Sequence, residues 1–184
     1  MKELFRKLFH MLVGLLLIAG YFLAQQWISL TAIYYLLFVG MTSSLVIDAV
    51  LAHLNWSAPG YKQLQRQHER NGIHSNSYFL LGTLLSFIMF EQHIALAAIL
   101  MLIFGDALAA LVGKRWGTPF LGQKSIEGSL TMFVVSLIVG LFVVESLPVV
   151  FIMAITAMIA ERFSGSLDDN VMIPLFAGLT GSLL

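Results

Sequence analysis

Long apolar stretches separated by short polar breaks follow one another along almost the whole chain. The apolar stretches cover residues 8–28, 30–54, 78–90, 94–112, 130–147, 149–160 and 171–184. A helix that spans a membrane needs about 20 predominantly apolar residues. The pattern therefore predicts about seven transmembrane helices. The last two stretches are short, so their helices must tilt, extend into the polar flanks or fail to span.

The composition agrees with a membrane protein. Of the 184 residues, 59% are hydrophobic and 11% are charged, and the mean hydropathy is +0.89. Soluble domains carry about 25% charged residues. We therefore expect an all-α, polytopic membrane helix bundle that forms one integral-membrane domain over residues 1–184. The absence of cysteine excludes disulfides and thiolate metal sites, and the net charge of zero gives no sign of nucleic-acid binding.

The positive charges all fall on one side of this topology. The ten cations are Lys2, Arg6, Lys7, Lys62, Arg66, Arg70, Lys114, Arg115, Lys124 and Arg162. The opposite side carries Glu91 and Glu145 and no Lys or Arg. Loops rich in Lys and Arg remain in the cytosol. The distribution predicts a cytosolic N-terminus and a chemically rich cytosolic face.

Asp106 lies inside an apolar stretch, and a glycine-rich basic loop of residues 113–128 follows it. Ionisable groups at membrane depth are costly, usually face the protein interior and mark functional sites. The loop supplies cations, hydroxyls and backbone N–H groups, and a helix that starts near Gly128 could hold a phosphate at its N-terminus. Two other interpretations stay open: Asp106 as a structural hydrogen-bonding residue, and the loop as a topology anchor.

Phosphoryl or nucleotidyl transfer requires cations around the phosphates, a bound metal and a placed nucleophile. Mg²⁺ favours one or two carboxylates together with phosphates and waters. The predicted cytosolic side offers these oxygen ligands: Asp106, Glu127, Glu161, Asp168, Asp169 and Asn170. Glu161, Asp168 and Asp169 could instead be a solvated helix end, with an N-cap at Asp169 or Asn170.

Two further features needed an interpretation. Residues 117–125 nearly match a Walker A loop, but they contain one extra residue before the lysine and no strand precedes them, so we reject a P-loop. Asp48, near the cytosolic end of the second apolar stretch, is either a hydrogen-bonding residue of the bundle or a residue that supports a site.

Three motifs occur together in an order that resembles the CTP-dependent lipid kinases. This family includes dolichol (polyprenol) kinases, phytol kinases and CTP-dependent diacylglycerol kinases. The motifs are Glu-Leu-Phe-Arg-Lys-Leu-Phe-His at 3–10, Gly-Asp-Ala-Leu-Ala-Ala-Leu-Val-Gly at 105–113 with Lys-Ser-Ile-Glu-Gly-Ser at 124–129, and Glu161 with Asp-Asp-Asn-Val-Met-Ile-Pro-Leu at 168–175. The double aspartate is more similar to the phytol kinase form.

The resemblance implies transfer of the γ-phosphoryl of CTP to the hydroxyl of a membrane lipid alcohol, with Mg²⁺ or another divalent cation. We assign catalytic roles to Asp106, Lys124, Glu127, Arg6 and Lys7, nucleotide contacts to Gly113, Lys114, Lys124, Ser125 and Gly128, and metal binding to Asp106, Glu161, Asp169 and Asn170. Glu127 or Asp106 would orient the lipid hydroxyl. The short chain suggests a minimal catalytic domain of a prokaryotic cytoplasmic membrane, with its active site facing the cytosol.

Two alternative functions stay open. A phosphatidate cytidylyltransferase-like enzyme would also use CTP and Mg²⁺ and has a related Gly-Asp core. A small cation- or proton-coupled transporter could use Asp106 as its ion site. For a kinase, the lipid alcohol stays open among polyprenol, phytol and diacylglycerol types.

Overall fold

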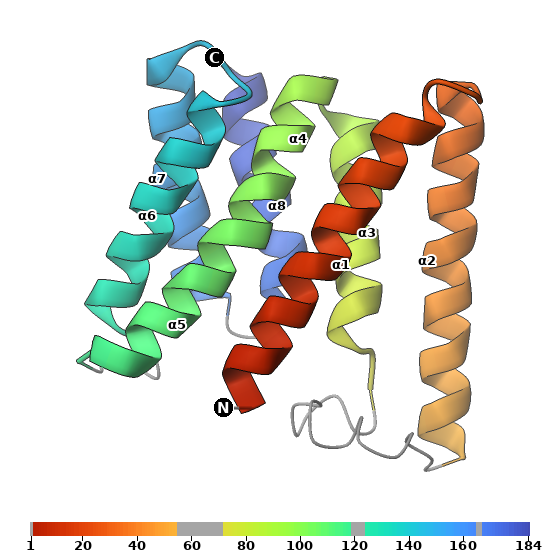
Figure 1. Cartoon of the computed structure of the whole chain (residues 1–184), viewed down its shortest axis with the longest axis horizontal. Coiled ribbons are helices and arrows are strands. Elements are labelled where there is room, and N and C mark those ends of the chain that lie inside the picture. The colour runs from red at the N-terminus through yellow and green to blue at the C-terminus, as the bar shows by residue number, and fades with distance from the viewer. Residues whose placement is uncertain (1, 55–71, 119–123, 165–166) are drawn as a thin grey trace. The chain divides into compact units, whose positions relative to one another are not determined.

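Helices make up almost all of the described chain. The computed structural model describes residues 2–54, 72–118, 124–164 and 167–184 (Figure 1). They form seven separate helical rods. One of these rods is the continuous run of α4, η3 and α5. The elements are α1 (Lys2–Ala24), α2 (Leu30–His53), α3 (Ser75–Met89), α4 (Gln92–Leu100), η3 (Met101–Asp106), α5 (Ala107–Trp116), α6 (Ile126–Leu141), α7 (Leu147–Phe163) and α8 (Asp169–Ser182). The prediction of an all-α membrane helix bundle is confirmed.

The helices differ in their capacity to cross a membrane. Within the described ranges, three segments are long and apolar enough: Phe5–Ala24, Leu30–His53 and Gln92–Trp116. The predicted stretch 130–147 is shorter as a helix, because α6 ends at Leu141 and α7 starts at Leu147. Pro148 lies in the first turn of α7, where its missing N–H removes no helical hydrogen bond. At its other end α7 extends to Phe163 in the polar flank, which is one of the three possibilities considered for this short apolar stretch.

The chain divides into two compact units, Met1–Leu84 and Leu85–Leu184. The first contains α1, α2 and most of α3, and the second contains the remaining helices. The single catalytic domain expected from the sequence stays a prediction, and each unit is described by itself.

In the first unit, Asp48 ties the start of α3 to α2. Its Oδ2 accepts hydrogen bonds from the backbone N–H of His74 at 2.9 Å and from the hydroxyl of Ser77 at 2.6 Å. Its Oδ1 contacts Nδ1 of His74. The hydroxyls of Ser44 and Ser77 are 2.6 Å apart. Of the two interpretations of Asp48, the structure shows the hydrogen-bonding one.

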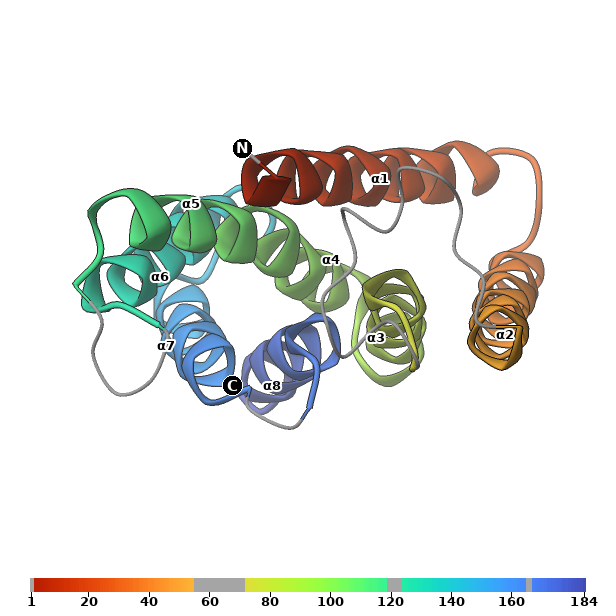
Figure 2. The same ribbon diagram turned by 90° about the horizontal axis from the view of Figure 1, so that it is seen from below.

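The second unit is a ring of four rods. The α4–η3–α5 rod contacts α6, α6 contacts α7, α7 contacts α8, and α8 contacts α4, as the view in Figure 2 shows. The π-helical segment η3 touches α6, α7 and α8. Its Met101, Leu102 and Ile103 side chains are fully buried. π-Helical turns occur mostly as local insertions within α-helices, frequently at functional sites, and this one ends at Asp106.

Glycines let the rods of this ring approach closely. A Cβ atom added at Gly140 in α6 would lie 2.6 Å from Cγ1 of Val150 in α7 and 2.7 Å from Cε of Met101 in η3. A Cβ at Gly105 would lie 2.5 Å from Sδ of Met132. Small residues at helix crossings permit the close packing that holds membrane helices together.

We expect Gly140→Ala to lower the free energy of unfolding by about 1–3 kcal/mol, as overpacking does. The added methyl group overlaps Val150, whose branched side chain has little rotamer freedom. Thermal unfolding in detergent measures the change. Gly40→Ala in α2 is the matched control, since a Cβ there meets no atom within 4 Å. Equal losses of melting temperature in both variants would contradict this packing role.

Candidate functional site

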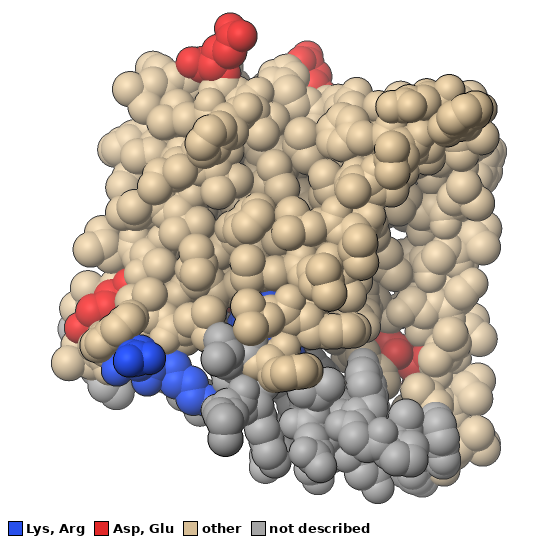
Figure 3. Space-filling view, in the orientation of Figure 1, with Lys and Arg blue, Asp and Glu red and all other residues tan. Residues whose placement is uncertain are grey.

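Cations collect at one end of the second unit. Lys114 and Arg115 lie in the last turn of α5, Arg162 lies in the last turn of α7, and Lys124 directly precedes the N-cap of α6. In the space-filling view, blue Lys and Arg atoms gather at the lower end of α5 (Figure 3). Of the remaining predicted cytosolic cations, Lys62, Arg66 and Arg70 lie outside the described residues. The cytosolic orientation of this end stays a prediction.

Three acidic residues from separate elements come together in this unit. Asp106 ends η3, Glu161 lies near the end of α7, and Asp169 begins α8. Their exposed fractions are 4%, 7% and 8%. Asp106 and Asp169 both interact electrostatically with Glu161. The structure thus gathers three of the four residues predicted to bind a metal, and the fourth, Asn170, is buried in the first turn of α8.

A cap at the start of α8 places two of these residues. Oδ1 of Asp168 accepts hydrogen bonds from the backbone N–H of Asn170 at 3.0 Å and from its side-chain amide at 2.6 Å. A carboxylate at this position satisfies an N–H group that has no partner within the helix. The cap therefore lies at Asp168, before both positions considered from the sequence, Asp169 and Asn170. As a result, Asp169 and Asn170 lie in the first helical turn.

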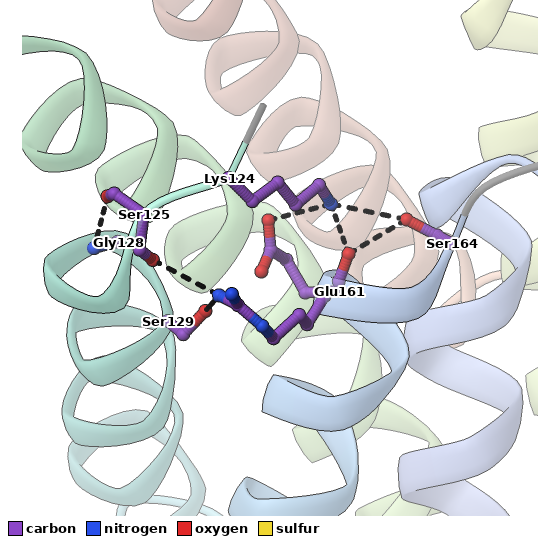
Figure 4. A network of polar contacts seen from close by, with 7 residues as sticks. Lys124, Ser125, Gly128, Ser129, Glu161 and Ser164 are labelled. Carbon is purple, nitrogen blue, oxygen red and sulfur yellow. Dashed lines mark hydrogen bonds and ion pairs between the residues drawn. The ribbon is translucent and has the colours of Figure 1, made fainter. Parts of the chain in front are cut away.

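Lys124 makes three contacts with the end of α7 (Figure 4). Its Nζ lies 2.8 Å from Oε1 of Glu161 and donates to Oγ of Ser164 at 3.2 Å. It also donates to the backbone carbonyl of Glu161. A lysine ammonium has three N–H donors, so these contacts can use all of them. The predicted phosphate ligand and a predicted metal ligand therefore bind each other in this structure.

The second carboxylate oxygen of Glu161 is in a different situation. Oε2 is buried and accepts no hydrogen bond from any residue that the structure describes. A buried carboxylate oxygen without a partner is unfavourable unless a cation balances it. Asp106 and Asp169 add negative charge beside the same carboxylate. The residues present therefore fit a divalent cation.

These acidic side chains do not form a closed ligand set by themselves. Over the described ranges, no group of three or more histidine or acidic side chains is arranged to hold a metal ion. Mg²⁺ commonly keeps several waters and takes one or two carboxylates together with substrate phosphates. An open arrangement is therefore compatible with Mg²⁺, and the metal-binding roles stay predictions.

The start of α6 packs closely against the end of α5. The hydroxyl of Ser125 accepts a hydrogen bond from the N–H of Gly128 at 3.0 Å and so caps α6. A Cβ at Gly113 would lie 2.9 Å from Oγ of Ser125 and 3.5 Å from Cα of Gly128. Both glycines therefore serve helix packing here. Their contacts with a nucleotide, and those of the exposed Lys114, stay predictions.

Glu127 links the first turn of α6 to Thr118, which follows the C-cap of α5. Its Oε2 accepts from the backbone N–H of Thr118 at 3.0 Å, and its Oε1 accepts from the Thr118 hydroxyl at 2.9 Å. Glu127 lies in the first turn of α6, before the predicted apolar stretch. A hydrogen bond from its own backbone N–H, together with those from Thr118, holds the pKa of this carboxyl below its usual value. The ionised carboxylate is thus an acceptor for Thr118, and its catalytic role stays a prediction.

Arg162 is a residue of this site that the sequence interpretation did not single out. Its Nη1 donates to Oγ of Ser129 at 3.0 Å and to the carbonyl of Ser125 at 3.4 Å. It thereby links the end of α7 to the start of α6. The signals in the sequence were its position next to Glu161 and its place among the ten cations of the predicted cytosolic side. The π-helical form of η3 was also missed, because its apolar residues suit an ordinary α-helix equally well.

Arg6 and Lys7 are in α1, within the first unit. The remaining predicted site residues all belong to the second unit; they are Asp106, Gly113, Lys114, Lys124, Ser125, Glu127, Gly128, Glu161, Asp169 and Asn170. The participation of Arg6 and Lys7 in a shared site therefore stays a prediction.

Comparisons with known proteins reveal several relatives. The chain is 31% identical to an uncharacterized protein of Rickettsia prowazekii, over 92% of this chain and 88% of that protein. It is 31% identical to CTP-dependent diacylglycerol kinase 1 of Eremothecium gossypii, over 74% of this chain and 44% of that protein. It is 26% identical to a probable chloroplastic phytol kinase of Zea mays, over 100% of this chain and 67% of that protein. No family model and no solved structure matches the chain.

These relatives agree with the motifs identified in the sequence. The chain spans less than half of the fungal kinase but about two thirds of the plant protein. The fungal and the plant relative carry two different lipid names, diacylglycerol and phytol, and both are named as kinases. The relatives named as CTP-dependent diacylglycerol kinases and phytol kinases support membership of this chain in the family of CTP-dependent lipid kinases.

Proposed function

We propose that this protein transfers the γ-phosphoryl group of CTP to the hydroxyl of a membrane lipid alcohol. The observation that carries the proposal is the buried group of Asp106, Glu161 and Asp169 beside Lys124, in a chain of this family. Relatives are named for diacylglycerol and for phytol. The acceptor is accordingly a lipid alcohol of the polyprenol, phytol or diacylglycerol type.

Charge compensation is the main requirement of this reaction. Bound Mg²⁺ would neutralise charge on the phosphate oxygens. Asp106, Glu161, Asp169 and the side-chain carbonyl of Asn170 would hold the cation. Lys114, Lys124 and Ser125 would hold the nucleotide phosphates, with Arg6 and Lys7 steadying charge on the transferred group.

The transfer forms one bond and breaks another. The lipid oxygen bonds to the γ-phosphorus while the bond from that phosphorus to the β–γ bridging oxygen breaks, and CDP leaves. The hydroxyl proton passes to a carboxylate, either Asp106 or Glu127. Of these two, Asp106 is the buried one, and a carboxylate shielded from water orients a hydroxyl more firmly than an exposed one.

The charge distribution supports a cytosolic site in a multi-pass membrane protein, and we propose a prokaryotic cytoplasmic membrane as its location. All ten Lys and Arg residues lie on one side of the predicted topology. The hydroxyl of a lipid alcohol lies at the level of the headgroups, whereas CTP is dissolved in the cytosol. A site at the basic end of the second unit can receive both substrates.

We expect Asp106→Asn to lower lipid phosphorylation by at least about 100-fold, the scale on which lost transition-state stabilisation acts. The amide keeps the shape of the side chain but loses the charge that a cation needs. Turnover with CTP and lipid alcohol, measured beside thermal unfolding, separates catalysis from folding. Glu91→Gln is the control, because this carboxylate precedes α4 and is 81% exposed. Near-normal turnover of folded Asp106→Asn would refute the central role of Asp106.

The position of a radioactive label in CTP distinguishes the alternative reactions. We expect label from the γ-phosphate to enter polyprenol, phytol or diacylglycerol supplied in vesicles that also contain phosphatidate, and label from the α-phosphate to remain in the aqueous phase. Lipid chromatography after incubation with the purified protein measures both. Transfer of α-label would instead identify a cytidylyltransferase. Ion flux without any transfer of label would identify a transporter.

A further inference from the structure

Two consecutive residues of α7 hold two consecutive residues at the start of α6. Glu161 pairs with Lys124, and Arg162 donates to the carbonyl of Ser125. Figure 4 shows Lys124 reaching across to Glu161 and Ser164 from the segment that leads into α6. The first link is an ion pair and the second is a hydrogen bond to the backbone. These two links differ in how readily a ligand can replace them.

The ion pair joins two groups with separate expected ligands. Lys124 is assigned to the phosphates of the nucleotide, and Glu161 is assigned to the divalent cation. In the structure, the carboxylate and the backbone carbonyl of Glu161, together with Ser164, provide three acceptors for the three N–H donors of Lys124. A phosphate can therefore bind Lys124 only when at least one of these acceptors gives way.

Of the three acceptors that contact Lys124, the carboxylate of Glu161 is the one that a metal ion can bind. Its Oε2 is buried without a partner among the described residues, and Asp106 and Asp169 act on it electrostatically. A divalent ion at Oε2 would lie close to the ammonium on Oε1 of the same group. Repulsion between two cations at such a distance is strong where solvent screening is weak. Binding of the metal therefore favours departure of Lys124.

We propose that Lys124 is an exchangeable counter-ion: it neutralises Glu161 in the unloaded protein and moves to the nucleotide phosphates when a divalent cation takes the carboxylate. The inference rests on the proposed function, since it concerns the same nucleotide and metal site. By thermodynamic linkage, the metal then raises the affinity for nucleotide, and the nucleotide raises the affinity for metal by the same factor.

The neighbouring contacts allow this exchange to leave the backbone in place. Arg162 still links α7 to Ser125 and Ser129, and Ser125 still caps α6. Glu127 still holds Thr118 across the basic loop. Only one side chain has to move. Arg162 is therefore a positioning residue. It holds the start of α6 where Lys124 can reach either Glu161 or the nucleotide phosphates.

Binding to the full chain in detergent tests the exchange without any turnover. Mn²⁺ binding is measured by electron paramagnetic resonance without nucleotide, and CTP binding by calorimetry in a metal chelator. We expect Lys124→Met to raise the affinity for Mn²⁺ at least about fivefold, and Glu161→Gln to raise the affinity for metal-free CTP similarly. The double variant should bind metal-free CTP more weakly than Glu161→Gln alone. Glu91→Gln should change neither affinity.

A second measurement uses the unaltered protein. Mg²⁺ alone should raise the rate at which an amine-specific reagent modifies Lys124, read by mass spectrometry, with Lys114 as the internal reference. An unchanged rate at Lys124 would overturn the exchange. So would unchanged affinity for Mn²⁺ in Lys124→Met, since Lys124 would then be a fixed phosphate ligand or a purely structural partner.

The two proposals fail in different ways. Reciprocal changes in binding without transfer of γ-label to lipid would refute the proposed kinase reaction and leave the proposed exchange of Lys124 standing. Transfer of γ-label with no reciprocal change in binding would refute only the proposed exchange of Lys124.

Discussion

Burial of carboxylates among apolar helices is the constraint on which the second unit depends. Asp106, Glu161 and Asp169 are each less than a tenth exposed, and they come from η3, α7 and α8. Buried charges are stable only when they are paired or bind cations. Lys124 supplies one such cation from outside these three elements. Among the described residues, Oε2 of Glu161 still has no hydrogen-bond partner, and the proposed divalent cation would balance it.

The apolar packing of the ring provides the rigid frame for these charges. Gly105 and Gly140 let η3 and α7 lie close to α6, while Gly113 and Gly128 join α5 to the start of α6. Close packing of this kind fixes the position in space of each helix end. Because the acidic and basic residues sit at helix ends or at the end of η3, the glycines control the charge geometry without contacting any charge.

The sequence predicted the helices well because long apolar stretches leave few alternatives in a membrane. It also drew attention to Asp106 as a charge within such a stretch, and the structure buries this residue. It missed the pairing of Lys124 with Glu161, because these residues are 37 positions apart and meet only through the packing of α6 against α7. It missed Arg162 for the same reason. The π-helical form of η3 left no trace in hydropathy, since both helix types bury the same apolar residues.

The π-helical segment also makes the length of this rod critical. Each residue of an α-helix turns the chain by about 100°, so one residue accommodated within η3 sets the rotation of α5 relative to α4. That offset lets one continuous rod face α8 with its first part and α6 with its last part. Deleting a single apolar residue between Met101 and Gly105 would leave the hydropathy profile almost unchanged. It would nevertheless turn Asp106 and the whole of α5 toward different neighbours.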